Sequence, residues 1–158
     1  MEGNRSIKYR EEVPLTQWAS IMIGLFITVL TPTILLEALG VYKEPKTLLL
    51  YVLLDTFFIV VLLNFRKLKV TIDDEYLVTS FGLIKKRINL SDIRASEAID
   101  ATLSVYTGMG IRYGGDGSLA YLPRLGEAIR IHFDKKRPFV FSTKNQEKIL
   151  EILNQHNR

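Results

Sequence analysis

Cysteine is absent from this 158-residue sequence, and histidine occurs only twice. The lack of cysteine excludes disulfide bonds, thiolate nucleophiles and cysteine-based metal sites. Neither His132 nor His156 belongs to a cluster with metal-ligand spacing, and the sequence has no Gly-x-Ser-x-Gly nucleophile elbow. Because no catalytic constellation can be assembled, we expect a non-enzymatic protein without a metal ion or cofactor.

Charge is missing from Val13 to Leu36, a run of 24 residues. A helix needs about 20 largely apolar residues to cross the hydrocarbon core of a membrane, and a helix of a soluble protein rarely stays apolar on every face. A second apolar run of 19 residues, Thr47 to Phe65, contains a single charged residue, Asp55. The sequence therefore predicts a transmembrane helical hairpin with spans at about residues 15–39 and 47–65.

The first apolar run has an alternative interpretation as a cleaved secretory signal, because basic residues precede it and Ala38-Leu-Gly40 resembles a cleavage site. The run is longer than the apolar region of a typical signal, so we favour an uncleaved anchor. The basic residues that flank the hairpin are Arg5, Lys8 and Arg10 before it and Arg66, Lys67 and Lys69 after it, whereas the connecting segment contains only Lys43 and Lys46. The positive-inside rule then predicts a multi-pass protein of the inner (cytoplasmic) membrane with both termini in the cytoplasm.

Asp55 lies near the middle of the second predicted span, where an ionised carboxylate costs about 2.5–3.5 kcal/mol. In one interpretation, protonated Asp55 forms a hydrogen bond with Thr28 or Thr31 at a similar depth in the first span. In another, Asp55 contacts a different membrane subunit or lines an ion path. Two helices make too thin a wall for a conduit, so transport would require an oligomer.

The hydrophobic pattern changes after Phe65. Leu68, Val70 and Ile72 alternate with polar residues, which is typical of a half-buried strand. Further strands are predicted at residues 76–81, 84–90, 91–97, 129–133 and 139–141. Thr143–Gln146 fits the capping box of a final helix. We predict that residues 66–158 form a small all-β sandwich or barrel closed by a C-terminal α-helix, and that residues 1–65 form a cytoplasmic segment and the hairpin.

Glycine is concentrated in the stretch from Thr107 to Gly117. A dinucleotide-binding fingerprint requires Gly-x-Gly-x-x-Gly between a strand and a helix. Glycines 108, 110 and 114 have a different spacing, and the following segment, which ends at Pro123, is unsuited to open a helix. Phosphate binding at a helix N-terminus is therefore unsupported. We interpret the glycines as marking bulges or close backbone approach, with a hairpin loop at residues 113–118.

This order of elements resembles the bacterial pleckstrin-homology-like (PH-like) domain family, which often follows paired spans in short membrane proteins. The resemblance covers roughly residues 66–155 and rests on Leu68-x-Val70-x-Ile72, Phe81-Gly82, Asp92-Ile93, Gly108–Arg112 and Phe141–Thr143. Met109 stands where the family pattern usually has Trp, and Gln146 where it commonly has Pro. Methionine fills irregular gaps in cores and glutamine suits a helix start, so the resemblance still implies a PH-like barrel.

The distribution of charged residues limits the classes of ligand that we expect this chain to bind. Some relatives of the pleckstrin-homology fold bind inositol phosphates through basic residues around the first hairpin, but this hairpin carries Asp73-Asp74-Glu75. We therefore predict no specific recognition of inositol lipids. Residues 1–65 carry a net charge of −1 and residues 66–158 a net charge of +5. The interspersed acids and the lack of a recognition helix argue against nucleic-acid binding.

Seven basic residues form a candidate surface for a partner protein or for membrane lipid: Lys85, Lys86, Arg87, Arg112, Lys135, Lys136 and Arg137. Near anionic lipid each such charge contributes about 1 kcal/mol; the alternative is that the charges serve solubility and topology. We expect a membrane-anchored adaptor or accessory subunit that docks another membrane or membrane-proximal protein, or a second copy of itself. The alternatives are an oligomeric ion-coupled transport component using Asp55 and a sensor of anionic lipid surfaces.

Overall fold

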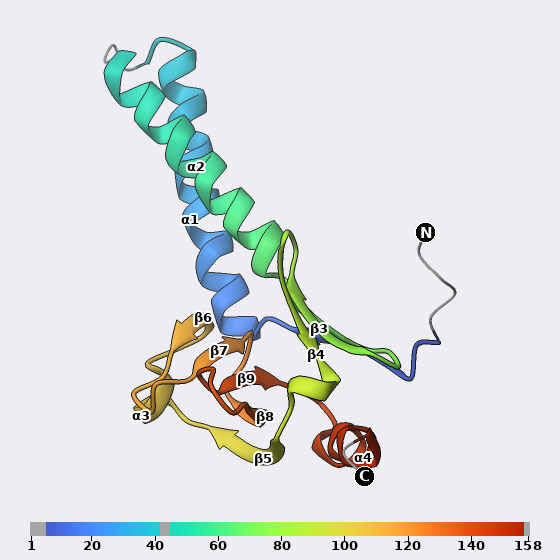
Figure 1. Ribbon diagram of the computed structural model, residues 1–158. Helices are drawn as coiled ribbons and strands as arrows, with labels where there is room; N and C mark the ends of the chain where they lie inside the picture. The colour runs from blue at the N-terminus through green and yellow to red at the C-terminus, as the bar shows by residue number, and fades with distance from the viewer. Residues whose placement is uncertain (1–5, 42–44, 157–158) are drawn as a thin grey trace.

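The computed structural model describes residues 6–41 and 45–156. Two long helices lie side by side above a β-rich unit, and a further helix lies at the opposite end of that unit (Figure 1). The helices are α1 (Gln17–Ala38), α2 (Pro45–Phe65), the short α3 (Leu103–Tyr106) and the last helix α4 (Gln146–His156), with a single 3-10 turn, η1, at Leu90–Asp92. The chain thus has a mixed α/β fold.

The β-rich unit contains two sheets. The first has the spatial order β1-β2-β3-β4 and consists of β1 (Tyr9–Pro14), β2 (Lys67–Ile72), β3 (Tyr76–Phe81) and β4 (Ile84–Asn89). The second has the order β5-β8-β9-β7-β6 and consists of β5 (Ala95–Ala101), β6 (Gly110–Tyr113), β7 (Leu119–Leu122), β8 (Gly126–His132) and β9 (Phe139–Ser142). All strand pairs are antiparallel except β7 and β9, which are parallel.

The main hydrophobic core lies between the two sheets. Alternate residues of β2 and β3 are buried against residues of β7, β8 and β9. The rings of Phe81, Tyr121 and Phe139 form a continuous row, with centroid separations of 5.8 and 5.2 Å. Ile149 and Leu153 of α4 join the same core. Burial of the apolar face of each sheet supplies the main stabilisation of the unit.

Helices α1 and α2 expose most of their apolar side chains; Val29 is 61% exposed and Leu53 is 59% exposed. Such exposure over so many turns is unfavourable in water. Within the described residues, α1 contains a segment, Ala19–Ala38, that is long and apolar enough to cross a membrane. The described apolar part of α2, Leu49–Phe65, is shorter.

The first strand, β1, belongs to the β-rich unit although it precedes α1. Its six residues pair with β2 in an antiparallel register that runs from Tyr9 opposite Ile72 to Pro14 opposite Lys67. Val13 is fully buried in the main core. The predicted boundary at residue 66 left this segment outside the unit. In the structure, α1 and α2 form an insertion between two neighbouring strands.

The helices join these strands almost without linkers. Two residues separate Pro14 from α1, and one residue, Arg66, separates α2 from β2. The amide of Leu15 donates to the carbonyl of Arg66 at 2.8 Å, and the amide of Thr16 donates to the carbonyl of Pro123 at 3.1 Å. The base of the helix pair is therefore hydrogen-bonded to both sheets, which fixes its direction relative to the β-rich unit.

Several predicted elements agree with the structure, and others are wrong. Strands β2, β3, β4, β8 and β9 and helix α4 lie where the pattern indicates, and β6 and β7 flank the predicted hairpin loop at residues 113–118. The predicted strand at 91–97 is wrong, because residues 90–92 form η1 and β5 begins only at Ala95. Asn89 Oδ1 accepts from the amide of Ser91 at 3.1 Å and stabilises this turn, a local contact that strand propensities do not capture.

The predicted capping box at Thr143–Gln146 is also wrong. The amide of Lys148 donates to Asn145 Oδ1 at 3.0 Å, which makes Asn145 the residue that caps α4. Thr143 Oγ1 instead accepts from the amide of Asn145. Gln146 Nε2 donates to the carbonyls of Ile99 and Ala128 at 2.8 and 2.9 Å. The glutamine therefore ties α4 to strands β5 and β8 and does not close a box at the helix start.

Candidate docking site: a basic pocket between the sheets

Two basic groups separated by about fifty residues of sequence meet around one pocket. Residues Lys86 and Arg87 of β4 and residues Lys136 and Arg137 of the loop before β9 line a cavity of about 320 Å³. Its other walls are formed by Ile88, Asp92, Tyr113, Leu119 and Phe133. Four basic residues and a single acidic residue therefore line this cavity. Lys85 and Lys135, the outermost residues of the two groups, are exposed to solvent outside it.

Lys86 points toward the interior of the β-rich unit. In the register of β3 and β4 it lies opposite Thr79, which is fully buried. Its Nζ lies 5.3 Å from the centroid of the buried Phe139 ring, a cation–π distance. Among the described residues Lys86 forms no ion pair, and the buried Thr79 Oγ1 has no hydrogen-bond partner. A half-buried ammonium group without an ion pair offers a binding position for an anion.

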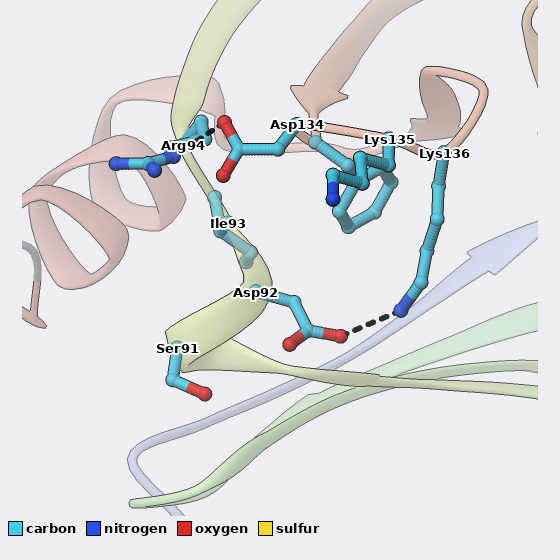
Figure 2. A pocket seen from close by; sticks show the side chains of 8 residues that line it. Ser91, Asp92, Ile93, Arg94, Asp134, Lys135 and Lys136 are labelled. Atoms are coloured by element: carbon cyan, nitrogen blue, oxygen red, sulfur yellow. Dashed lines mark hydrogen bonds and ion pairs between the residues drawn. The ribbon is translucent and has the colours of Figure 1, made fainter.

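The loop at residues 134–137 is held beside the pocket by two ion pairs, which Figure 2 shows as dashed lines. Arg94 Nε lies 2.5 Å from Asp134 Oδ1, and Lys136 Nζ lies 2.7 Å from Asp92 Oδ2. Because these pairs are largely exposed, their contribution to stability is small. The ion pairs instead hold the loop in place, and Asp92 also neutralises Lys136. Arg137 has no ion pair in the part of the chain that the structure describes.

Aromatic rings accompany the arginines of the site. The guanidinium carbon of Arg137 lies 5.5 Å from the centroid of the Tyr113 ring. That of Arg87 lies 3.4 Å from the Tyr76 ring on the outer face of the first sheet. Sequence analysis did not identify Tyr113 or Phe133 as part of a site. They enter it because β6 and the loop after β8 converge on β4 in space, and no local pattern signals that convergence.

Strand β4 forms an open edge beside the pocket. It pairs with β3 on one side, and in the described part of the chain no strand pairs with its other side. An open edge presents unpaired backbone donors and acceptors that an extended segment can complete. The site therefore combines backbone hydrogen-bonding groups with a concentration of positive charge.

Arg112 does not belong to this pocket, although it was grouped with the same candidate surface. Its Nε donates to the carbonyl of Met109 at 2.5 Å, and its Nη1 donates to the carbonyl of Thr107 at 3.0 Å. A Cβ atom on Gly108 would lie 3.2 Å from the guanidinium carbon. The arginine thus binds the backbone of the glycine-rich segment, and Gly108 permits this close approach.

The hairpin loop between β6 and β7 is organised around Asp116. Its carboxylate accepts from the hydroxyl and the amide of Ser118 at 2.7 and 3.0 Å, and it also pairs with Arg130 of β8. Burial raises the pKa of the Asp116 carboxyl, but the Ser118 hydrogen bonds and the Arg130 charge outweigh burial, so the pKa lies below its ordinary value. These polar contacts fix the loop against β8.

Asp55 and Thr31 lie together between α1 and α2. Thr31 Oγ1 is 3.2 Å from Asp55 Oδ2 and 2.8 Å from the carbonyl oxygen of Ile27. The hydroxyl of Thr31 is therefore within donor distance of both the Asp55 carboxylate and the Ile27 carbonyl. Thr28 does not participate; it donates to the carbonyl of Leu25 at 2.9 Å. The Thr31–Asp55 hydrogen bond joins the two helices.

Within residues 6–41 and 45–156, no group of three or more acidic or histidine side chains is placed to hold a metal ion. His132 Nε2 lies 3.0 Å from Glu97 Oε1 on the solvent-facing side of the second sheet. Comparison with known proteins finds no family model, no curated protein and no solved structure that matches this chain.

Proposed function

We propose that this chain is a non-enzymatic membrane-anchored adaptor that docks an acidic, extended segment of another membrane or membrane-proximal protein. In this proposal α1 and α2 are a transmembrane hairpin of the cytoplasmic membrane, and both chain termini face the cytoplasm. The β-rich unit is a PH-like domain held directly beneath the bilayer. The basic pocket and the neighbouring edge of β4 form the docking site.

The exposed apolar surface of both helices supports the membrane anchor, since hydrocarbon is the solvent in which that surface is stable. The role of β1 supports retention of α1 as an anchor. Cleavage after Gly40 would remove β1 and its buried Val13 from the first sheet. A signal sequence would not be expected to supply a core strand of the mature fold.

One observation carries the docking proposal: the inward-pointing Lys86, which has no ion-pair partner in the described chain, lies beside an open strand edge. Acidic side chains of a bound strand would neutralise Lys86 and Arg137 while its backbone pairs with β4. A lipid headgroup offers the charge but not the backbone groups, so the edge favours a protein segment. Confinement to the membrane surface raises the effective concentration of such a partner.

Site-specific photocrosslinking tests the proposal. A photoreactive phenylalanine analogue replaces Tyr113, which lines the pocket and is largely exposed. Ultraviolet irradiation of intact cells should yield an adduct whose crosslinked peptide, identified by mass spectrometry, is rich in Asp or Glu. The adduct should be lost in the charge-reversal variant K86E/R137E, because both cations that attract the segment are gone.

Lys135→Glu is the matched control, since Lys135 carries the same charge in the same loop but lies outside the pocket. It should leave the adduct at its original yield. An adduct to phospholipid would show that the site binds a membrane surface and would overturn the proposed partner class. Equal loss of the adduct in K86E/R137E and in K135E would show that crosslinking depends only on the overall charge and would contradict a specific site. Absence of any adduct would contradict the docking proposal and would mean that the cations only protect the open edge of β4 from pairing.

A further inference from the structure

The turn between β3 and β4 carries an exposed apolar pair. Leu83 is 87% exposed, and Ile84, the first residue of β4, is 42% exposed. Single exposed hydrophobic residues are common on protein surfaces. These two are adjacent at the tip of a hairpin, however, and the next residues along the chain are Lys85, Lys86 and Arg87.

This turn is fixed against the last turn of α2. Asn64 Oδ1 accepts from the amide of Leu83 at 3.2 Å, while Asn64 Nδ2 donates to the carbonyl of Val60 at 2.9 Å. Gly82 has a φ of +48°, and a Cβ atom at this position would lie 2.6 Å from Asn64 Oδ1. Only glycine therefore allows the turn to approach the helix so closely. The rings of Phe65 and Phe81 meet just below, with centroids 5.2 Å apart.

The contact with Asn64 sets the level of the turn relative to a bilayer. Asn64 and Phe65 end the apolar run of α2, and Arg66 and Lys67 follow directly. In a membrane-anchored chain this change from apolar to basic residues marks the boundary between hydrocarbon and headgroups. Figure 1 shows the β3–β4 turn rising alongside the lower end of α2. The exposed side chain of Leu83 therefore lies at the depth of that boundary.

An apolar groove lies at the same level between the helices and the glycine-rich segment. It has a volume of about 490 Å³ and is lined by Ala19 and Ile23 in the first turns of α1, by Val61 and Phe65 in the last turns of α2, and by residues 108–112. The side of the β-rich unit that faces the helices is thus apolar at two places. An aqueous environment would leave both unfavourably exposed.

We infer that the β3–β4 tip inserts into the lipid interface, with Leu83 and Ile84 among the upper acyl chains and Lys85 beside anionic headgroups. This inference rests on the membrane anchor of the proposed function. The bilayer then contacts the β-rich unit at a point outside the helix pair. Because the tip is bonded to α2, insertion fixes the orientation of the unit on the membrane and with it the direction in which the basic pocket opens.

Single-cysteine labelling tests the inference in the full-length chain, which has no cysteine of its own. Leu83→Cys, Leu53→Cys and Lys135→Cys are each labelled with a polarity-sensitive fluorophore and reconstituted into nanodiscs of neutral and anionic phospholipid. At position 83 we expect a blue-shifted emission that is quenched by lipids spin-labelled near the headgroup. Position 53, exposed in the middle of α2, should be quenched by lipids spin-labelled deep in the chain. Position 135 should be quenched by neither.

The two proposals fail differently in this experiment. Lipid quenching at position 53 together with a water-like spectrum at position 83 would overturn insertion of the tip and leave the anchor intact. Absence of lipid quenching at position 53 would overturn the anchor itself. Since Leu83 and Leu53 are both exposed, neither replacement disturbs the core. Ile84→Cys provides a second reporter, for which we expect weaker quenching than at position 83 because its side chain is half as exposed.

Discussion

Asp116 illustrates how individual charged residues are used in this protein. It lies in the β6–β7 loop, accepts two hydrogen bonds from Ser118 and pairs with Arg130 on a different strand. Arg130 also contacts Glu97 of β5 at 3.4 Å, so one guanidinium connects the loop to an edge strand. The surrounding stretch from Thr107 to Gly117, with five glycines and one aspartate, looks like a ligand-binding loop in the sequence. Its aspartate is instead occupied by contacts within the protein.

The depressed pKa of Asp116 predicts a specific dependence of stability on pH. A carboxyl whose pKa is lower in the folded state stabilises the fold above its ordinary pKa of about 3.9, and this stabilisation is lost as pH falls through the folded-state value. Asp116→Asn should therefore unfold at a lower urea concentration than the parent at neutral pH. The difference should vanish in strong acid, where both chains are neutral at this position. Circular dichroism in detergent measures both midpoints.

Asp100→Asn is the control for this titration. Asp100 is exposed, and in the described chain its side chain forms no hydrogen bond or ion pair. The same substitution there should leave the urea midpoint unchanged at every pH. A constant difference between Asp116→Asn and the parent across the whole pH range would show that Asp116 acts through the shape of its side chain and not through its charge.

Asp55 was identified from the sequence by the rarity of a charge within an apolar run, and Arg112 by its place in a glycine-rich block. The structure gives each a partner inside the protein: Thr31 for Asp55, and the carbonyls of Thr107 and Met109 for Arg112. The sequence alone does not distinguish Thr28 from Thr31 as the partner of Asp55. The choice between them depends on the rotation and depth of α1 relative to α2, which is set by packing along the whole pair.

Among the helices and strands, β1 differs most from what the sequence predicts. The segment Tyr9–Pro14 contains three charged residues and only one buried apolar residue, Val13, so its sequence lacks the alternation that predicts a strand. Its pairing partner, β2, is more than fifty residues away. Glu12 forms an ion pair with Lys67 at 2.6 Å across the two strands. The strand forms because β2 offers an edge at the base of the helices.

Val13→Ala tests the contribution of β1. It removes two methyl groups from a fully buried side chain, which should lower the free energy of unfolding by about 2 kcal/mol. Urea denaturation in detergent, followed by near-ultraviolet circular dichroism of the tyrosine-rich β unit, measures the change. Val29→Ala is the matched control: it makes the same chemical change on the exposed face of α1 and should shift the midpoint little. Equal effects at the two positions would contradict a core role for β1.

The strands β5, β6 and β7 were the least accessible to sequence analysis. Ala95–Ala101 lies at the edge of its sheet and has a mixture of small and charged residues. Strands β6 and β7 have four residues each and lie inside a glycine-rich region. Their apolar residues are too few to produce a period of two over a useful length. Strands β5 and β7 are specified by pairing with β8 and β9, whose patterns are clear, and β6 in turn pairs with β7.

At the scale of the whole molecule, a helix pair continues two adjacent strands without linkers. This arrangement leaves the β-rich unit no freedom to swing away from the membrane in which we propose that the helices lie. The basic pocket, the open edge of β4 and the exposed tip at Leu83 then have fixed positions relative to that surface. An adaptor with this geometry would present its docking site in one orientation.

The proposed topology predicts the accessibility of cysteines introduced on the two sides of the membrane. A membrane-impermeant maleimide added to intact cells should label Val41→Cys, which is exposed at the end of α1. It should not label Lys135→Cys until the cells are permeabilised, because the β-rich unit faces the cytoplasm. Labelling of Lys135→Cys in intact cells would reverse the orientation. Recovery of the unlabelled chain in the soluble fraction without detergent would contradict the anchor.

The two apolar helices, the central strands and the final helix can be predicted from the amino-acid sequence. These follow from hydrophobic periodicity, which is a local property of the chain. Three features become clear only from the packed fold: β1 completes the first sheet, Thr31 contacts Asp55, and two distant basic groups line one pocket. Each of these features depends on contacts between residues far apart in the chain. The free energy of such contacts is gained only after the sheets pack, so no short stretch of sequence predicts them.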